Sequence, residues 1–357
     1  MNRKIRPLAF YLPQFYPTLE NDEWWEPGFT EWTNVIRSKP LFDGHYQPRF
    51  PRDLGFYDLR VPDTREKQAE LARYAGIEGF CYWHYWFAGR RLLDDVFREV
   101  VESGKPDYPF CLCWANHSWY AKTWTPNAPD KLLIEQTYPG VQDYENHFYA
   151  MLPAFRDHRY MKVEGKLIFG IFAPIGFDIK TFAEVWNALA IKEGLPTFWF
   201  FALVKKEEQL EKFDKTQYNA VVFDTVADAY SSEGYSWLKA HWRELKRRLH
   251  IPYAVEYDVY IQKTMELFRK HPDIVPCINP DFDHSPRAGW RSTILKNSTP
   301  EKWGDLCQRV RNIVEDQSSN EGVIFIKAWN EWGEGNYMEP DQKWGTGYVE
   351  ASRKAFL

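Results

Sequence analysis

Cysteine is scarce in this sequence, with five cysteines among 357 residues. Such a sparse, odd set in a long chain does not form the disulfide framework of a small secreted domain, and it suggests a reducing compartment. Cys111 and Cys113 lie two apart in an apolar run and so share one face of a predicted strand. Because no further Cys or His stands nearby at ligand spacing, we interpret them as buried structural thiols and expect no metal site.

Long hydrophobic runs are absent as well. No stretch approaches the roughly 20 apolar residues that a membrane-spanning helix requires. The basic start of the chain runs into Leu8–Pro13, which is too short and too soon interrupted by proline for a signal peptide. We therefore expect a cytoplasmic protein without a membrane span.

The charge balance excludes other classes of partner. Net charge is −5 and no block of basic residues occurs, so the sequence lacks the electrostatic footprint for nucleic acid or an anionic membrane. It also has no glycine-rich dinucleotide fingerprint after the first predicted strand, no phosphate-binding loop, no Gly-x-Ser-x-Gly elbow and no His-Glu-x-x-His. We expect no cofactor.

Aromatic side chains, in contrast, are abundant. They make up 18% of the sequence, with 17 Trp, 21 Tyr and 25 Phe. A core does not need so many tryptophans, because each buried indole N–H requires a partner. Flat apolar rings with one polar group suit the faces of sugars. Many of these tryptophans stand beside polar residues at predicted strand ends, which favours carbohydrate binding over aromatic-rich packing alone.

Short apolar runs alternate with helical patterns along the whole chain. Their β-branched and aromatic residues are typical of completely buried parallel strands. We predict strands at Leu8–Phe15, Gly79–Phe87, Phe110–Trp114, Leu167–Ala173, Phe198–Val204, Ala220–Val226, Ile274–Ile278 and Val323–Trp329. We predict helices at Asp63–Tyr74, Asp143–Arg156, Ile179–Glu193, Ser236–Leu249, Val259–Lys270 and Pro300–Asp316. The first of these helices opens with Asp63-Thr64-Arg65-Glu66, which is similar to a capping box.

This alternation predicts an α/β fold, a closed (β/α)8 TIM barrel of parallel strands. An open, doubly wound sheet is the alternative. Since no repeat or linker divides the chain, residues 1–357 are expected to form a single domain.

Residues 17–63, between the first and second strands, are too long for a plain connection. They contain Trp24, Trp25 and Trp32, and Glu31 adds a weaker carboxylate candidate. Because the segment follows the carboxyl end of the first strand, the face on which barrel active sites are built, we predict that it caps a substrate cleft.

Several predicted strands end in polar and aromatic residues, and the carboxyl ends of barrel strands meet at one face. Each such residue alone fits a strand cap or a satisfied core position, whereas their recurrence indicates a shared pocket. The predicted substrate-binding residues are Tyr11, Gln14, Trp32, His84, Tyr85, Trp86, Trp114, Asn116, His117, Trp119, Asp283, Arg287, Asn330, Trp332 and Glu339.

Glu331 and Glu334 are the predicted catalytic residues. Glycoside chemistry needs two carboxyl groups, one able to donate a proton and one ionised. Residues three apart in a strand face opposite sides, but Gly333 and Gly335 let the backbone curl into a turn that brings both side chains together. Neighbouring tryptophans supply an apolar wall that raises one carboxyl pKa. The structural alternative is that one glutamate caps the next segment or pairs with arginine.

Some predicted contacts also have a structural alternative. His84 and His117 are interpreted as neutral hydrogen-bonding groups rather than metal ligands, because no third ligand stands at a recognisable spacing. Asp283 and Arg287 fit a sugar contact or a structural ion pair equally well. Glu339 fits contact with sugar hydroxyls or a surface salt bridge.

Several segments together resemble the WbsX-type proteins, which have a domain like that of glycoside hydrolase family 99. These segments are Leu8–Phe15, Asn21–Trp25, Gly28–Val35, Gly44–Pro48, Asp53–Arg60, Cys113–Asn116 and Trp329–Gly335. The resemblance covers essentially the whole chain. WbsX-type proteins are bacterial and are often encoded with polysaccharide or O-antigen genes, so it implies a part in lipopolysaccharide or other surface-polysaccharide metabolism.

The resemblance implies a (β/α)8 barrel that acts on glycosidic bonds. Family 99 enzymes are endo-acting α-mannosidases and α-mannanases that retain the anomeric configuration and need no metal. By resemblance, Glu331 deprotonates the sugar 2-hydroxyl, which attacks the anomeric carbon to give a 1,2-anhydro sugar. Glu334 then corresponds to the general acid, and later the general base for water. Direct attack by a carboxylate is the mechanistic alternative.

Two residues depart from the WbsX-type pattern. The relatives often have an acidic residue at the position of His117 and asparagine at that of Lys327. A lysine pointing into the barrel alters the pKa values around it. The leading hypothesis is a retaining glycoside hydrolase acting on an oligosaccharide or polysaccharide. The alternatives are a glycosyltransferase or transglycosylase in surface-polysaccharide assembly, and a non-catalytic carbohydrate-binding barrel.

Overall fold

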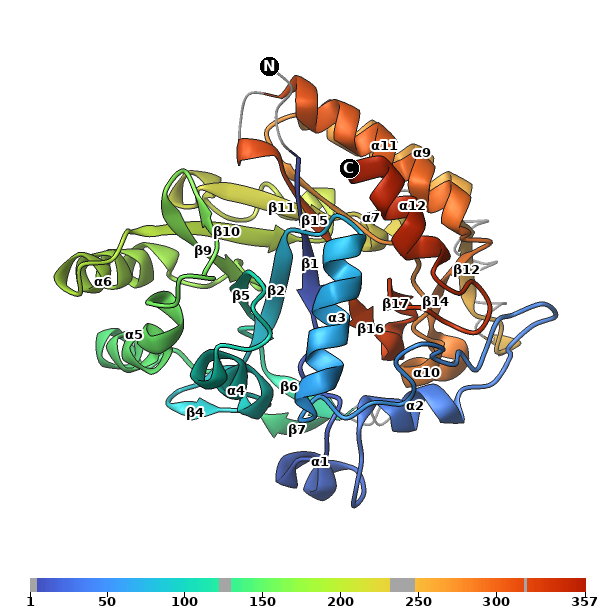
Figure 1. Ribbon diagram of the computed structural model, residues 1–357, viewed down its shortest axis with the longest axis horizontal. Coiled ribbons are helices and arrows are strands. Elements are labelled where there is room, and N and C mark those ends of the chain that lie inside the picture. Colours follow the sequence, from blue (N-terminus) through green and yellow to red (C-terminus); the bar gives the residue numbers. More distant parts are fainter. Residues whose placement is uncertain (1–4, 122–129, 232–247, 318–319) are drawn as a thin grey trace.

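The computed structural model describes residues 5–121, 130–231, 248–317 and 320–357. Its centre is a closed barrel of parallel strands (Figure 1). In chain order these are β1 (Arg6–Tyr11), β2 (Gly79–His84), β5 (Phe110–Trp114), β9 (Lys166–Ile171), β10 (Phe198–Val204), β11 (Ala220–Asp224), β13 (Val275–Ile278) and β15 (Val323–Ile326). Neighbours follow chain order, and β15 pairs with β1 to close the ring. This closure confirms the predicted (β/α)8 barrel, and the open-sheet alternative is wrong.

The strands form where the sequence has its apolar runs, and each overlaps a predicted range. Their side chains are almost all buried, because they fill either the barrel interior or the layer beneath the outer helices. Gly170 of β9 leaves room inside the barrel for the Phe201 ring of β10. A Cβ at this position would collide with that ring and with Cys113 Sγ.

Helices surround the barrel (Figure 1). The longer ones are α3 (Pro62–Tyr74), α4 (Asp95–Ser103), α5 (Val141–Phe155), α6 (Ile179–Lys192), α9 (Tyr257–Lys270), α11 (Pro300–Asp316) and α12 (Gly347–Phe356). Of these, α4 and α12 have no predicted counterpart. The predicted helix Ser236–Leu249 lies largely outside the described residues. The predicted capping box is wrong: α3 begins at Pro62, whose fixed φ starts a helix, and no side chain caps it.

Short elements fill the connections. The helical ones are α1 (Leu19–Trp24), α2 (Glu31–Arg37), α7 (Val226–Ser231), α10 (Ser285–Ala288) and the 3-10 turns η1 (Glu207–Gln209), η2 (Lys215–Gln217), η3 (Gly289–Arg291), η4 (Asn320–Gly322) and η5 (Trp332–Glu334). The paired strands are β3 (Trp86–Phe87) with β4 (Arg90–Arg91), β6 (Trp119–Ala121) with β7 (Lys131–Ile134), β12 (Tyr253–Glu256) with β14 (Thr293–Lys296), β16 (Asn330–Glu331) with β17 (Asn336–Tyr337), and β8 (Lys162–Val163) with β9.

Residues 17–63 carry α1 and α2 past the carboxyl end of β1. In Figure 1 this blue segment lies beyond the carboxyl ends of the barrel strands. The Trp24 ring of α1 meets the Trp119 ring of β6 at a centroid distance of 5.9 Å. Thr30 caps the start of α2, and α2 packs against α10 and η5. The segment therefore lies at the barrel face where the site was predicted.

The five cysteines are free and buried. Cys111 and Cys113 are thus buried packing residues, as predicted. Burial raises the pKa of the Cys81, Cys113 and Cys277 thiols well above its usual value. In the described part of the chain, no group of three His, Cys, Asp or Glu side chains is arranged to hold a metal ion. No helix described there is long and apolar enough to cross a membrane.

Candidate active site

The segment after β15 brings the two candidate carboxylates together. Strands β16 and β17 pair in antiparallel fashion, and η5 forms a single turn between them. Gly335 ends that turn at φ 57°, a left-handed conformation that side chains rarely adopt. Glu331 and Glu334 consequently line one cavity. The curl of the backbone is the one predicted from the two glycines.

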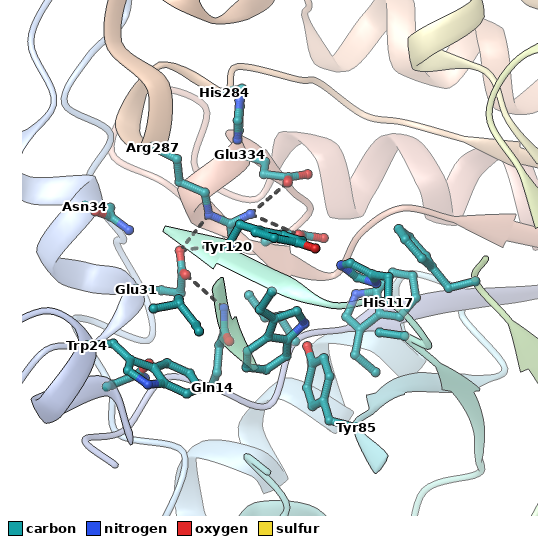
Figure 2. Close-up of a pocket in the computed structure, with 18 of the residues that line it drawn as sticks. Gln14, Trp24, Glu31, Asn34, Tyr85, His117, Tyr120, His284, Arg287 and Glu334 are labelled. Atoms are coloured by element: carbon teal, nitrogen blue, oxygen red, sulfur yellow. Dashed lines mark hydrogen bonds and ion pairs between the residues drawn. The ribbon is translucent and has the colours of Figure 1, made fainter. Parts of the chain in front are cut away.

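Arg287 of α10 gathers three carboxylates in this cavity. Its Nη1 donates to Glu334 Oε1 at 2.7 Å, and its Nε donates to Glu31 Oε2 at 3.1 Å. The same Nη1 lies 3.5 Å from Glu331 Oε1. Figure 2 shows Arg287 between Glu31 and Glu334. A guanidinium suits this position because its five N–H donors point in fixed, divergent directions.

Lys327, directly after β15, is a second cation beside the pair. Its Nζ lies 3.3 Å from Glu334 Oε2 and 3.5 Å from Asp224 Oδ2. Burial alone would lower the pKa of Lys327, but the two carboxylates raise it above its usual value. Lys327 thus stays charged and lines the cavity, where it acts on the neighbouring glutamates.

The two glutamates differ in acidity. Burial raises the pKa of Glu331 to about 7, and the adjacent Glu334 carboxylate adds to the increase. Burial also acts to raise the pKa of Glu334, but Lys327 and Arg287 outweigh it and hold that pKa well below its usual range. Glu334 is therefore the more acidic of the pair, and Glu331 is the member that takes up a proton as the pH falls through about 7.

The cavity is large enough for sugar units and is rich in aromatic rings. Its volume is about 670 Å³, within the usual range of small-molecule sites. The rings that line it belong to Trp24, Trp25, Phe29, Trp83, Tyr85, Trp119, Tyr120 and Phe172. Trp25 and Tyr120 are 48% and 49% exposed, so they form part of an open rim.

Residues 17–63 supply part of the cavity wall. They contribute Asn21, Trp24, Trp25, Phe29, Glu31 and Asn34. Glu31 accepts a hydrogen bond from Gln14 Nε2 at 2.8 Å. A Cβ on Gly333 would collide with the Glu31 carboxylate, so the glycine allows this close approach. Glu31, the weaker candidate in sequence, belongs to the carboxylate cluster. The capping function of the segment stays a prediction.

Some of the predicted site residues meet in this cavity. They are Gln14, Tyr85, His117, Trp119, Arg287, Glu331 and Glu334. Figure 2 shows His117 on the side of the cavity away from Trp24 and Glu31. Their contact with a sugar and their parts in catalysis stay predictions.

Other predicted contacts point outward from their strands and do not line the cavity: Tyr11, His84, Trp86, Trp114 and Asn116. Tyr11 donates its hydroxyl to Gln68 of α3 at 2.7 Å. His84 Nε2 lies 2.7 Å from His147 Nε2 of α5. Side chains alternate between the two faces of a strand, so these residues pack beneath the outer helices instead of lining the cavity.

The remaining outward residues are likewise bonded within the protein. Trp86 donates to the Asp143 carboxylate of α5 at 3.1 Å, and Trp114 donates to the carbonyl of Trp86 at 3.1 Å. Asn116 donates to the carbonyl of Ala173 at 3.0 Å. These polar atoms are occupied beneath the cavity wall, and contact of these residues with substrate stays a prediction.

Four more predicted contacts hold the loops together behind the cavity: Trp32, Asn330, Trp332 and Glu339. Glu339 is buried and accepts from Trp332 Nε1 at 2.7 Å and from the Tyr57 hydroxyl at 2.8 Å, so it is not a surface salt bridge. Its contact with sugar stays a prediction. Trp32 donates to a backbone carbonyl. Asn330 bonds the N–H and C=O of the residue that follows β1.

Asp283 forms the structural pairing that was the alternative to a sugar contact. It is buried and accepts from His45 Nε2 at 2.8 Å and from Gln47 Nε2 at 2.7 Å, with Arg49 Nη2 at 3.5 Å. Burial acts to raise the pKa of Asp283, but His45 and Arg49 hold it well below its usual range. Asp283 thus ties residues 17–63 to the loop after β13, and its contact with sugar stays a prediction.

Several lining residues were not among the predicted site residues, notably Trp83, Phe172, Lys205, His284 and Lys327. Lys205 follows β10 directly, and a charged residue at the end of an all-apolar run is a signal that was available in the sequence. His284 lies between the predicted residues Asp283 and Arg287 in sequence, whereas nothing in the sequence pattern marks Phe172.

The fold is a parallel barrel whose clustered carboxylates and aromatic rings lie at the carboxyl ends of its strands. A solved structure described as a glycoside hydrolase-like protein covers 99% of this chain and 94% of its own, with a TM-score of 0.62 and 13% identity. The GH99 endo-alpha-mannosidase from Bacteroides thetaiotaomicron covers 98% and 96%, with a TM-score of 0.56 and 12% identity. At these identities the likeness concerns the fold.

The chain belongs to the family described as Glycosyltransferase WbsX, which matches residues 7–352. The protein WxcX of Xanthomonas campestris pv. campestris is 34% identical over 361 residues, which is 98% of this chain and 49% of WxcX. The chain thus spans about half the length of the curated relatives it matches. Family and fold together confirm the predicted WbsX-type, family 99-like resemblance.

Proposed function

We propose that this chain is a retaining glycoside hydrolase that cleaves internal linkages of an oligosaccharide or polysaccharide, with α-mannoside-like bonds as the first candidates. The observation that carries the proposal is the pairing of Glu331 and Glu334 on Arg287 inside an aromatic-lined cavity. Glycoside hydrolysis needs one carboxyl group that holds a proton and one that is ionised. The charges around this pair create that difference at neutral pH.

The open aromatic rim supports action within a chain rather than at its end. Trp25 and Tyr120 are about half exposed at the cavity mouth. Such rings stack on sugar faces while leaving the chain free to extend in both directions.

In the proposed first step, ionised Glu331 takes the proton of the sugar 2-hydroxyl as that oxygen attacks the anomeric carbon. The bond to the leaving oxygen breaks, and that oxygen takes a proton from Glu334. Water then opens the 1,2-anhydro sugar at the anomeric carbon while giving a proton to Glu334. The 2-oxygen recovers its proton from Glu331, and the two inversions together retain the configuration.

This cycle begins with Glu331 ionised and Glu334 protonated. In the free protein that state is the less populated one, because the proton of the pair lies mainly on Glu331. Substrate favours the shift for a physical reason. A 2-hydroxyl that donates to Glu331 stabilises its ionised form, and a glycosidic oxygen that accepts from Glu334 stabilises its protonated form. The sugar thereby moves the proton to the carboxyl group from which it is needed.

The test is hydrolysis of α-mannan and related oligosaccharides without any nucleotide, with the anomer of the product followed by NMR. Glu331→Gln and Glu334→Gln should each lower kcat by ~10²–10⁴-fold. With an aryl glycoside, whose leaving group needs no proton, Glu334→Gln should recover the first step and Glu331→Gln should not. Equal rates in wild type and Glu334→Gln on the natural linkage would overturn the proposed roles.

The family description favours one second candidate, a glycosyltransferase or transglycosylase. Incubation with oligosaccharide acceptors, with and without sugar nucleotides, separates the two. Turnover that requires a sugar nucleotide would replace the hydrolase proposal. Binding without any turnover would instead point to a carbohydrate-binding barrel.

A further inference from the structure

Lys205 is a cation of the cavity that the proposed mechanism does not use. It follows β10 and lines the cavity. Among the described residues, no carboxylate oxygen lies within 4.0 Å of the Lys205 Nζ, the limit for an ion pair. The other two cations are engaged: Arg287 contacts glutamates, and Lys327 lies between Glu334 and Asp224.

The surroundings of Lys205 are aromatic. Its Nζ lies 3.9 Å from the centroid of the Phe172 ring, on which the His117 ring also stacks at 4.8 Å. The Trp83 ring stands nearly perpendicular to the same Phe172 ring, with the two centroids 5.5 Å apart. Burial lowers the pKa of Lys205, and the charge of Lys327 adds to the decrease. A bound anion would stabilise the charged form of an ammonium that is buried in this way.

We propose that Lys205, His117 and Phe172 form a subsite for a sugar residue that carries a carboxylate, as in a uronic acid. The Phe172 ring holds the Lys205 ammonium and the His117 ring against it, and the Trp83 ring, which also lines the cavity, meets the apolar surface of the sugar. The ammonium of Lys205 receives the carboxylate, and His117 has an N–H donor for it in either protonation state. In Figure 2 His117 lies across the cavity from Trp24 and Glu31, so the subsite is at the end away from residues 17–63.

The charge balance selects a monoanion. Lys205 is one positive charge without a carboxylate in contact, and one carboxylate neutralises it. A dianion such as phosphate would bring a further negative charge toward Glu331 and Glu334, both of which act on Lys205 electrostatically. The inference rests on the proposed action on carbohydrates and names the class of sugar within it.

Binding measurements test the subsite without requiring cleavage. Methyl glycosides of glucose, galactose and mannose are each compared with the corresponding methyl uronate, by calorimetry on the wild-type protein. In at least one pair the uronate should bind about tenfold or more tightly than the neutral sugar. Lys205→Met should abolish that preference and Lys205→Arg should keep it.

Lys206→Met is the matched control, because it removes the same charge from the adjacent, exposed side chain. Its preference for uronates should equal that of the wild type, and thermal melting of each variant shows that it is folded. Equal binding of acid and neutral sugar in all three pairs would overturn the subsite. So would a Lys205→Met variant that keeps the preference, or inorganic phosphate that competes better than any uronate. A uronate preference in a protein that hydrolyses nothing would overturn the proposed function alone.

Discussion

At the residue scale, the acidity of each carboxylate in the cavity depends on its distance from Arg287 and Lys327. Arg287 touches Glu31, Glu331 and Glu334, whereas Lys327 touches only Glu334 of these three. Glu334 therefore has both cations in close contact, at 2.7 and 3.3 Å, whereas Glu331 has Arg287 at 3.5 Å and feels the charge of Lys327 without an ion pair to it. Two glutamates three positions apart thus acquire different acidities from their partners, as a proton-transfer pair requires.

The first prediction concerns the pH dependence of catalysis. We expect kcat/KM to fall as the pH rises through about 7, the pKa of Glu331. Above that pH the pair has lost the proton that general acid catalysis needs, whichever glutamate delivers it. Initial rates across the neutral and alkaline range give the profile. A rate that continues to rise well above neutrality would contradict this assignment.

The second prediction concerns Lys327. Its charge lowers the pKa of both Glu331 and Glu334, so Lys327→Met should move both limbs of the pH–rate profile to higher pH. The matched control is Lys206→Met, which removes a charge from an exposed side chain outside the cavity and should leave the profile in place. If Lys327→Met also left the profile in place, Lys327 would have no part in setting these pKa values.

Sequence reasoning located the strand ends but not the side of the strand that faces substrate. After β2, Trp83 and Tyr85 line the cavity, while His84 and Trp86 between them pack beneath α5. In a barrel the outer face of each strand is covered by helices and is as buried as the inner face. Hydrophobicity therefore does not distinguish the two faces. Because side chains alternate along a strand, one residue known to face the cavity would be needed to assign the others.

At the element scale, residues 17–63 are held to the barrel by a buried acid. Asp283, in the loop after β13, accepts hydrogen bonds from His45 and Gln47 of that segment. Arg49 adds an ion pair to Asp281, at 2.8 Å. These contacts hold in place the segment that carries Glu31 into the cavity.

The third prediction tests this attachment. Asp283→Asn removes the charge that faces His45 and Arg49, so it should cost about 2 kcal/mol and speed amide hydrogen exchange in residues 41–49. Exchange followed by mass spectrometry measures the effect peptide by peptide. Asp305→Asn is the control, because it breaks only an exposed pair on α11 and should change exchange little. Unaltered exchange in Asp283→Asn would mean that other contacts hold the segment.

Most of the elements were predictable because each carries its own pattern. The eight barrel strands follow apolar runs, and helices such as α6 and α11 follow helical spacing over many residues. The helix α4 has only nine residues, so its helical spacing extends over too few positions to stand out in the sequence. The carboxylate of Glu31 lies on a helix of seven residues, whose place over the barrel depends on packing with α10 and η5.

At the scale of the whole molecule, closure of the barrel brings its strand ends to one cavity. The β10–β9 pairing and the β15–β1 pairing complete the ring. Inside it, side chains from neighbouring strands must share a limited volume. Gly170 provides the space that the Phe201 ring occupies.

The fourth prediction tests this packing. Gly170→Ala should destabilise the protein by about 1–3 kcal/mol, because the new methyl group meets the Phe201 ring and Cys113 in a filled interior. Thermal or denaturant unfolding measures the change. Gly304→Ala is the matched control: in α11 its Cβ makes ordinary contact with Ala351, and alanine favours a helix, so stability should stay equal or rise. A Gly170→Ala variant as stable as the wild type would show that Phe201 and Cys113 move to make room for the methyl group without a cost in stability.

The sequence by itself determined the order of strands and helices, the family, and the segment that carries Glu331 and Glu334. Each of these is read from residues that are close together in the sequence, so none depends on how distant parts of the chain pack. Only the tertiary structure decided which groups share the cavity. Arg287 and Glu31 stand 256 positions apart, and Lys205 and His117 meet on one ring from different strands. Such contacts depend on barrel closure and on inward or outward orientation, which composition and periodicity do not encode.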